Sequence, residues 1–150
     1  PGSVLTSTIE GNDALTLEVQ ALVAESVYSN PQRMTSGPDR NRIMMLLAVC
    51  EKIIGLGLGT KDCFINVIGG LKISDPATDL AVCAALVSSA RGIAVKKDTL
   101  ILGEVGLSGE IRPVTRILKR CLTAGKIGVK TVVLPGSCRA ANKHDGRICD

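Results

Sequence analysis

Residues 72–89 read KISDPATDLAVCAALVSS, and this stretch decides how the rest of the chain is interpreted. Asp75 and Thr78 belong to the residue types that cap helix N-termini, and Pro76 is tolerated in a first helical turn because its missing N–H needs no partner there. The sequence therefore predicts a helix from about Ala77 to Ala90. Its side chains are mostly small, so another element can approach its backbone closely; the small residues are Ala77, Ala81, Ala84, Ala85 and Ser88.

The segments before this helix predict strands and one further helix. Apolar and polar residues alternate in 4–11 and 14–26, and a Gly-Asn-Asp turn signal between them predicts a β-hairpin. The apolar run CFINVIGG at 63–70 predicts a buried strand. Asp39 precedes a helical apolar stripe, which consists of Ile43, Leu46, Leu47, Cys50 and Ile54.

The segments that follow the helix at residues 77–90 also predict both strands and a helix. Residues 98–114 predict a strand, a glycine-rich turn and a second strand, and 130–135 (KTVVLP) predicts a last strand. A helix is expected over 115–125 with Ile117, Cys121 and Ala124 facing inward. Because strands and helices mix without strict alternation, we expect an α/β fold, with helices and a sheet in α+β layers. The expected divisions are a cloning remnant at 1–3, one domain at 4–136 and an irregular tail at 137–150.

The composition restricts the possible functions. Of the 150 residues 45% are hydrophobic, which is enough for a core, but only 1% are aromatic, which argues against binding single strands by base stacking. The six cysteines contain no C-x-x-C pair, so no zinc site is expected. GLGLGT at 55–60 lacks the Lys-Ser/Thr of a phosphate-binding loop and is interpreted as a helix stop. No apolar run has the length of a membrane span.

Charge is distributed unevenly along the chain. Residues 1–110 contain nine Lys/Arg and twelve Asp/Glu, whereas residues 111–150 contain nine Lys/Arg and two Asp. This asymmetry predicts either a solvated basic tail or a basic binding surface toward the C-terminal end.

Five segments in order resemble a known family. They are LEVQALV, DRNRIMMLLAVCEK, FINVIGGLKISDPATDLAVCAALVSS, ILGEVGLSGEIRPV and KIGVKTVVLP, within roughly residues 4 to 136. Together they resemble the C-terminal domain of RadA/Sms proteins, which is similar to the proteolytic domain of Lon proteases. The resemblance implies the ribosomal protein S5 domain 2-like fold. After Pro135 the chain departs from the family pattern, which continues with a further strand and helix.

Lon proteases use a serine nucleophile that is activated by a lysine amine. Aligning their PSAG-type segment with DPATDLAV puts Ala77 at the serine position and Asp79 at the following glycine. Counting back from KTVVLP puts Leu118 at the lysine position. With both reactive groups replaced by hydrocarbon, we expect no enzymatic activity from this chain. Two alternatives stay open: a peptidase with a displaced dyad, for which Ser74 and Lys119 are the nearest candidates, and a module that binds peptides or proteins.

The RadA/Sms resemblance also implies partners. These proteins are recombination and DNA repair ATPases, so ATP, Mg²⁺ and Zn²⁺ are expected to bind domains that this chain lacks. It further implies a hexameric ring, non-specific binding of single-stranded or duplex DNA, no membrane contact, and an intracellular location, in the cytoplasm of bacteria or in a chloroplast or mitochondrion of plants. The candidate DNA-binding residues are Arg33, Arg40, Arg42, Arg91, Lys96, Lys97, Arg112, Arg116, Lys119, Arg120 and Lys126, with further basic residues at Lys130, Arg139, Lys143 and Arg147.

Overall fold

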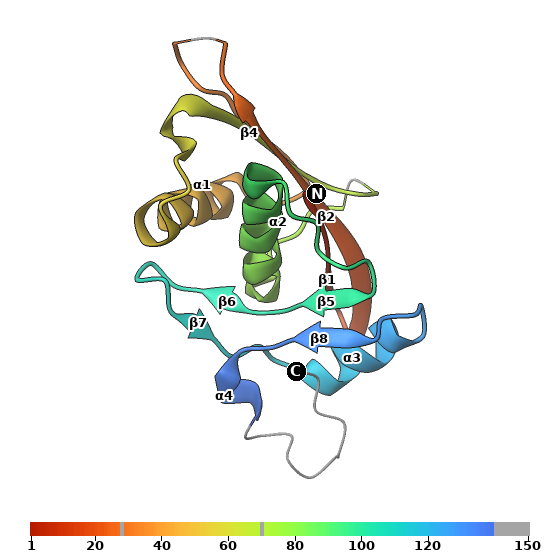
Figure 1. Ribbon diagram of the computed structural model, residues 1–150. Helices are drawn as coiled ribbons and strands as arrows, with labels where there is room; N and C mark the ends of the chain where they lie inside the picture. Colours follow the sequence, from red (N-terminus) through yellow and green to blue (C-terminus); the bar gives the residue numbers. More distant parts are fainter. Residues whose placement is uncertain (28, 70, 140–150) are drawn as a thin grey trace.

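A computed structural model describes residues 1–27, 29–69 and 71–139. Its main sheet is formed by six strands (Figure 1), and these are, in spatial order, β3 (Arg33–Ser36), β4 (Lys61–Val67), β2 (Asp13–Glu25), β1 (Ser3–Glu10), β5 (Thr99–Ile101) and β8 (Thr131–Val133). Strand β2 runs antiparallel to β1 and β4, while the other three neighbouring pairs are parallel. The predicted hairpin at residues 4–26 and the mixed α/β class are confirmed.

Helices and shorter elements connect these strands. The helices are α1 (Arg40–Val49), α2 (Asp79–Arg91), α3 (Ile117–Gly125) and α4 (Gly136–Arg139), with a π-helical turn at Cys50–Ile54 and 3-10 turns at Leu58–Thr60 and Pro76–Thr78. Strands β6 (Glu104–Val105) and β7 (Ile111–Arg112) form a separate antiparallel hairpin. The predicted strand–turn–strand at residues 98–114 is therefore divided, because its first strand, β5, joins the main sheet instead of pairing with β7.

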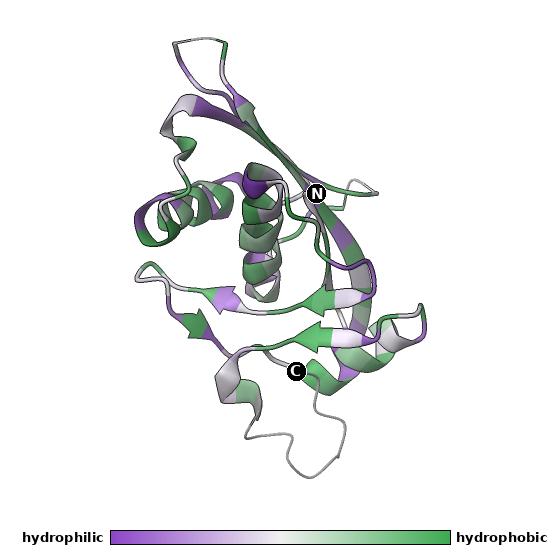
Figure 2. Ribbon diagram, in the orientation of Figure 1, coloured by the Kyte–Doolittle hydropathy of each residue, from purple (hydrophilic) through white to green (hydrophobic). Residues whose placement is uncertain are grey.

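Helices cover both faces of the sheet. Successive side chains of a strand point to opposite faces, and two separate apolar clusters result. The larger cluster joins α1 and α2 to the sheet through residues such as Leu46, Leu86 and Val19. The smaller one, which includes Ala124 and Leu100, packs α3 against the other face. Helix α2 is mostly apolar, with polar residues toward its two ends (Figure 2), which suits its position between α1 and the sheet.

Helix α1 begins and packs as predicted but ends differently. The Asp39 carboxylate accepts a hydrogen bond from the Asn41 N–H at 3.1 Å, and most of the predicted stripe is buried. Ile54, the last member, is 40% exposed, because the chain changes to a π-helical turn at Cys50 and the helical phase shifts. Gly55 then ends the helix in the left-handed conformation (φ 69°), as the helix-stop interpretation of residues 55–60 predicts.

The first residues of the chain take part in the fold. The Gly2 carbonyl accepts from the Ala21 N–H at 2.8 Å, and the Gly2 N–H donates to Ser88 Oγ at 2.8 Å. Ser3 is the first residue of β1. The proposed tail at 137–150 lies mostly outside the described residues. In the part of the chain that is described, no helix combines the length and apolarity needed to cross a bilayer.

Candidate functional site

Ala77, the residue that the sequence aligns with a Lon-type serine, borders a small cavity with a mixed polar and apolar lining. The Asp75 side chain caps the 3-10 turn by accepting from the Ala77 N–H at 3.0 Å. The Ala77 carbonyl in turn accepts from the Gly103 N–H at 2.9 Å, which fixes the turn against the segment leading into β6. The side chain is 3% exposed and borders a cavity of about 100 Å³ that Asp75, Glu104, Thr115 and Arg120 also line.

Arg120 faces this cavity from α3. Its guanidinium donates to the Asp75 carboxylate at 2.9 Å, to the Ser7 carbonyl at 2.7 Å and to the Thr115 carbonyl at 2.8 Å. The side chain is 1% exposed. The prediction that Arg120 lies on an exposed basic face, available to DNA, is therefore wrong. Helical position alone did not predict this burial. A buried arginine is tolerated when its N–H groups donate hydrogen bonds to a carboxylate and to backbone carbonyls, as they do here.

The structure does not bring Leu118, the residue assigned to the lysine position, together with Ala77. Leu118 is 51% exposed and does not line the cavity, whereas Arg120 does. A guanidinium remains protonated in proteins and has no lone pair to accept a proton, so Arg120 cannot replace the base of a Ser–Lys dyad.

Asp75 is held in its ionised form by this network. Burial disfavours the carboxylate, but hydrogen bonds from the Ala77 N–H, from Arg120 and from the Ile9 N–H outweigh burial and lower the Asp75 pKa below its ordinary value of 3.8. Asp75 and Arg120 thus form a mostly buried ion pair that joins α3, β1 and the start of the Ala77 turn.

The residues considered for a displaced dyad do not converge on the cavity. Ser74 and Lys119 are exposed, and neither lines the space next to Ala77. The hydroxyls further along α2 serve the fold: Ser88 Oγ accepts from the Gly2 N–H, and Ser89 Oγ accepts from the Val23 N–H at 2.9 Å.

A second buried ion pair was missed by sequence reasoning. Asp79, 1% exposed, accepts from Arg42 Nε at 2.6 Å and from the Val105 N–H at 3.1 Å. Burial raises the Asp79 pKa despite the Arg42 contact, while the bond to Asp79 raises the Arg42 pKa. The only available signal was an acidic residue at the first turn of an apolar helix, together with an arginine on the preceding helix.

Arg33 and Arg40, which are also DNA-binding candidates, likewise donate hydrogen bonds within the chain. Arg33 donates to the backbone carbonyls of Lys61 and, at 2.7 Å, of Leu58, and Arg40 donates to the Arg33 carbonyl at 3.0 Å. Together with the Asp79 pair of Arg42, these contacts fix the edge of the sheet and the start of α1. The structure thus uses this group for internal contacts.

The remaining candidates are exposed, but some have local partners. Arg112 lies 3.4 Å from the Glu110 carboxylate, and Arg116, at φ 54°, donates to the Gly11 carbonyl at 3.5 Å. Arg91 and Lys119 are exposed on α2 and α3. Of the additional basic residues, Lys143 and Arg147 lie outside the described residues.

Four exposed lysines gather at one edge of the sheet. Strands β5 and β8 pair in parallel with Thr99 opposite Thr131, so the loops that lead into them start at the same edge (Figure 1). The two loops are joined by the Lys130 N–H, which donates to the Asp98 carbonyl at 2.9 Å. Helix α3 ends beside them with Lys126 as its C-cap. We call this group the lysine edge, and its members are Lys96, Lys97, Lys126 and Lys130.

The lysine edge differs from the buried arginines in its pairing. Within the described residues none of its ammonium groups lies in an ion pair. Glu18 lines a hollow together with Lys96 and Lys97, and Asp98 lies between the two loops. Sequence reasoning named all four lysines but placed Lys96 and Lys97 in one group and Lys126 and Lys130 in another, since the two loops meet only through the pairing of β5 with β8.

Most of the described cysteines are buried. Cys50, Cys63, Cys83 and Cys138 are each at most 6% exposed, and the Cys50 and Cys83 thiols contact each other between α1 and α2, which raises the pKa of Cys83. Among the described residues no three His, Cys, Asp or Glu side chains are arranged to hold a metal ion.

Residues 40–137, about two thirds of the chain, match the family model described as subunit ChlI of Mg-chelatase. The chain belongs to this family. The match begins at α1 and extends through the Ala77 turn, α3 and β8, so it includes both the cavity and the lysine edge.

The chain is also similar to curated proteins named DNA repair protein RadA. Identity is 47% over 135 residues for the Pseudomonas aeruginosa protein, 40% over 136 residues for that of Bacillus subtilis and 47% over 137 residues for that of Aquifex aeolicus. Each alignment covers 90–91% of this chain and 30–31% of the relative. The chain therefore spans about a third of the length of these relatives, in agreement with the resemblance that its motifs indicate.

Proposed function

We propose that this chain is a non-proteolytic, Lon-like scaffold domain of a RadA-type DNA repair protein, and that it contributes non-specific DNA binding through the lysine edge. The fold would be of the ribosomal protein S5 domain 2-like type. The observation that carries the DNA-binding proposal is the meeting of four exposed lysines, which form no ion pair with any described residue, at one edge of a protein whose relatives are named DNA repair proteins.

The chemistry of the lysine edge suits a phosphate backbone. Each lysine that neutralises a phosphate releases condensed counterions, which makes binding favourable and dependent on salt. The edge lacks a fixed array of base-reading side chains, so binding would not depend on sequence. Arg91 and Lys119 would extend the positive surface, whereas Arg33, Arg42 and Arg120 would not take part because their guanidinium groups are used internally.

The chemistry at Ala77 supports the non-proteolytic part of the proposal. A methyl group cannot act as a nucleophile, and the group opposite it is a guanidinium held by Asp75. Thr115 offers a hydroxyl at the cavity, but no neutral amine lines the cavity to activate it. The geometry therefore favours a scaffold over a peptidase.

The whole protein would be a recombination ATPase that assembles as a homo-oligomeric ring, hexameric in the full-length context. ATP with Mg²⁺, and Zn²⁺, would bind regions other than this chain. We expect it to work inside the cell, in the cytoplasm of a bacterium or in a chloroplast or mitochondrion of a plant.

DNA titration tests the proposal. Fluorescence anisotropy of a labelled duplex, at about 50 mM salt where phosphate contacts are strongest, should report binding by the chain. Replacing the four lysines of the lysine edge by Gln should remove most of it. A control variant, Lys52→Gln with Lys72→Gln, changes two exposed lysines elsewhere and should bind nearly as the unchanged chain does. Equal binding by all three proteins would contradict the assignment of DNA to the lysine edge.

Two further measurements separate the alternatives. Mass determination in solution, with and without DNA, tests ring formation. Incubation with fluorescent casein tests proteolysis, with Ser74→Ala and Lys119→Ala as controls. Casein cleavage that either substitution abolishes would establish a displaced dyad and end the scaffold interpretation.

A further inference from the structure

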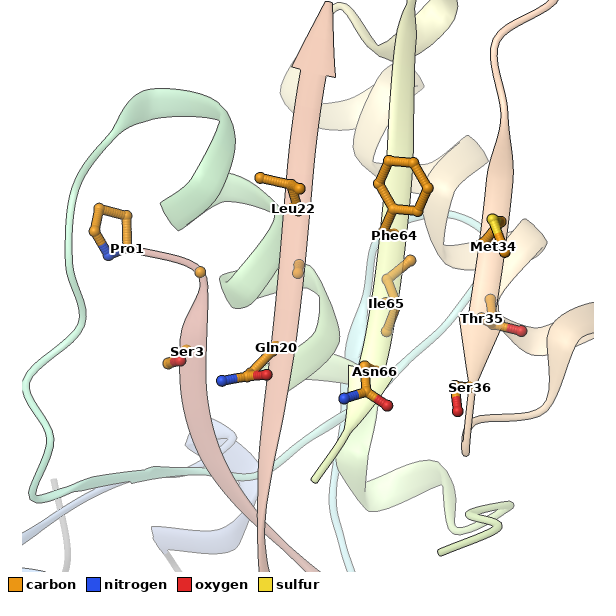
Figure 3. Close-up of a pocket in the computed structure, with 12 residues that line it drawn as sticks. Pro1, Ser3, Gln20, Leu22, Met34, Thr35, Ser36, Phe64, Ile65 and Asn66 are labelled. Atoms are coloured by element: carbon orange, nitrogen blue, oxygen red, sulfur yellow. The ribbon is translucent and has the colours of Figure 1, made fainter. Parts of the chain in front are cut away.

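Helix α3 covers only part of the sheet face opposite α1 and α2, and the part formed by β2, β4 and β3 carries an exposed, striped surface. In β2, β4 and β3, the register places Leu22 opposite Phe64 and Phe64 opposite Met34. Leu22 and Met34 are each 56% exposed, and they flank Phe64 in a row of cross-strand neighbours that would be expected to pack. Figure 3 shows these three side chains side by side across the strands.

A polar row runs parallel to this apolar row. Ser3 pairs with Gln20, Gln20 with Asn66 and Asn66 with Ser36, so a hydroxyl, two amides and a second hydroxyl cross four strands, two residues along from the apolar row (Figure 3). The two rows line a hollow of about 450 Å³, and no charged side chain contributes to its lining.

This hollow continues toward the lysine edge. Ser3 also lines a second hollow of about 440 Å³, whose other lining residues include Leu5, Glu18, Lys96 and Lys97. The linings of the two hollows share Pro1 and Ser3, so a path from Lys96 and Lys97 to the uncharged rows of β2, β4 and β3 crosses the start of β1.

We propose that this path, which we call the striped face, holds a single strand of nucleic acid. The inference rests on the proposed function, because the phosphates would be bound by Lys96 and Lys97, and it adds the position of the bases. A single strand exposes flat apolar rings that can stack on an aromatic side chain, and Phe64 supplies one between Leu22 and Met34. The amides of Gln20 and Asn66 can hydrogen-bond to base edges, as amide side chains do elsewhere.

The charge and shape of the path favour this occupant over the others. A duplex keeps its bases stacked inside and would leave the apolar row unused. An extended peptide would need few cations, while this path has two lysines at one end and a single carboxylate, Glu18, beside them. The low aromatic content of the sequence argued against base stacking. Composition gives the number of aromatic side chains but not their positions, and one of the two, Phe64, lies in this apolar row.

A single introduced tryptophan tests the inference, because the chain has none. Leu22→Trp places the ring in the striped face, and Met44→Trp places it on α1, at a site that is 40% exposed on the other side of the sheet. Oligodeoxythymidylate of about 12 nucleotides, within the site sizes of single-strand binders, should quench the fluorescence of Leu22→Trp and leave that of Met44→Trp unchanged.

A charge substitution supplies the second readout. Leu22→Asp puts a carboxylate in the apolar row at an exposed position, so it should fold while repelling the strand. We expect it to weaken oligodeoxythymidylate binding about tenfold, the size of the loss of one stacking contact, and to leave duplex binding unchanged. Circular dichroism confirms the fold of each variant.

The outcomes separate the two proposals. If oligodeoxythymidylate binds through the lysine edge but Leu22→Trp is not quenched, the striped face is not its path and the DNA-binding function stands. If reduced, carboxymethylated casein quenches Leu22→Trp and the oligonucleotide does not, the face belongs to a protein partner and the inference is overturned. If neither single-stranded nor duplex DNA binds, both proposals fail.

Discussion

Arg120 lies within α3, and Lys126, six residues later, caps the C-terminal end of the same helix. The fold nevertheless uses their charges in opposite ways. Arg120 is buried with its guanidinium on Asp75 and two backbone carbonyls, whereas Lys126 is exposed at the helix end. The same division runs through the molecule: several arginines bind the chain's own backbone and carboxylates, and the lysines of the lysine edge face solvent. Net charge alone therefore overstates the surface that is available to an anionic partner.

The largest expected effect comes from removing the buried cation. Arg120→Ala leaves Asp75 as an unpaired, largely buried carboxylate, and breaking such a pair costs about 3–5 kcal/mol. Urea denaturation should show this loss in the free energy of unfolding. Lys119→Ala, at the exposed neighbouring position, should change it by less than about 0.5 kcal/mol. Similar stabilities for the two variants would show that Arg120 does not hold the fold.

The Arg42–Asp79 pair should give the next largest effect. Arg42 is 27% exposed, so screening by solvent reduces the free-energy cost of removing it, whereas Asp79 is almost completely shielded from solvent. We expect Arg42→Ala to lower the free energy of unfolding by about 2 kcal/mol. Asn41→Ala, on the same helix and exposed, is the matched control. Loss of DNA binding by a stable Arg42→Ala protein would move Arg42 back among the DNA-binding candidates.

The pH dependence of stability distinguishes the two carboxylates. The pKa of Asp75 is lowered in the folded state, so its contribution is present above the unfolded pKa, near 3.8, and is lost as pH falls through the folded pKa. The pKa of Asp79 is raised, so its contribution is present at lower pH and lost as pH rises through the folded pKa. Urea denaturation over the acid range should therefore show a shallower acid loss for Asp75→Asn and a steeper one for Asp79→Asn. Equal slopes would contradict these assignments.

The smallest effect is expected at Ala77. Ala77→Ser adds one hydroxyl beside an existing cavity, so stability should change by about 1 kcal/mol or less. No casein cleavage should appear, because Arg120 cannot accept the proton of the new hydroxyl. Cleavage by Ala77→Ser would show that another group in the cavity acts as a base.

Local sequence signals predicted the elements well. The turn at residues 11–13, the Asp39 cap and the alternation of apolar residues each depend on neighbours within a few positions, and all three are confirmed. Arg120 was assigned to the wrong face, because its acceptors on Ser7 and Asp75 lie 113 and 45 residues away and no local pattern encodes them. The lysine edge was likewise divided between two groups, since it depends on the pairing of β5 with β8.

The salt dependence of duplex binding tests the central claim most directly. The slope of log Kobs against log salt concentration reports how many phosphates are neutralised, at about 0.9 per contact. If the lysine edge forms the contacts, replacing its four lysines by Gln should lower the slope by about 1 for each lysine that touches a phosphate, while Lys52→Gln with Lys72→Gln leaves it unchanged. An unchanged slope in the lysine-edge variant, with its fold intact, would place the DNA elsewhere on the molecule.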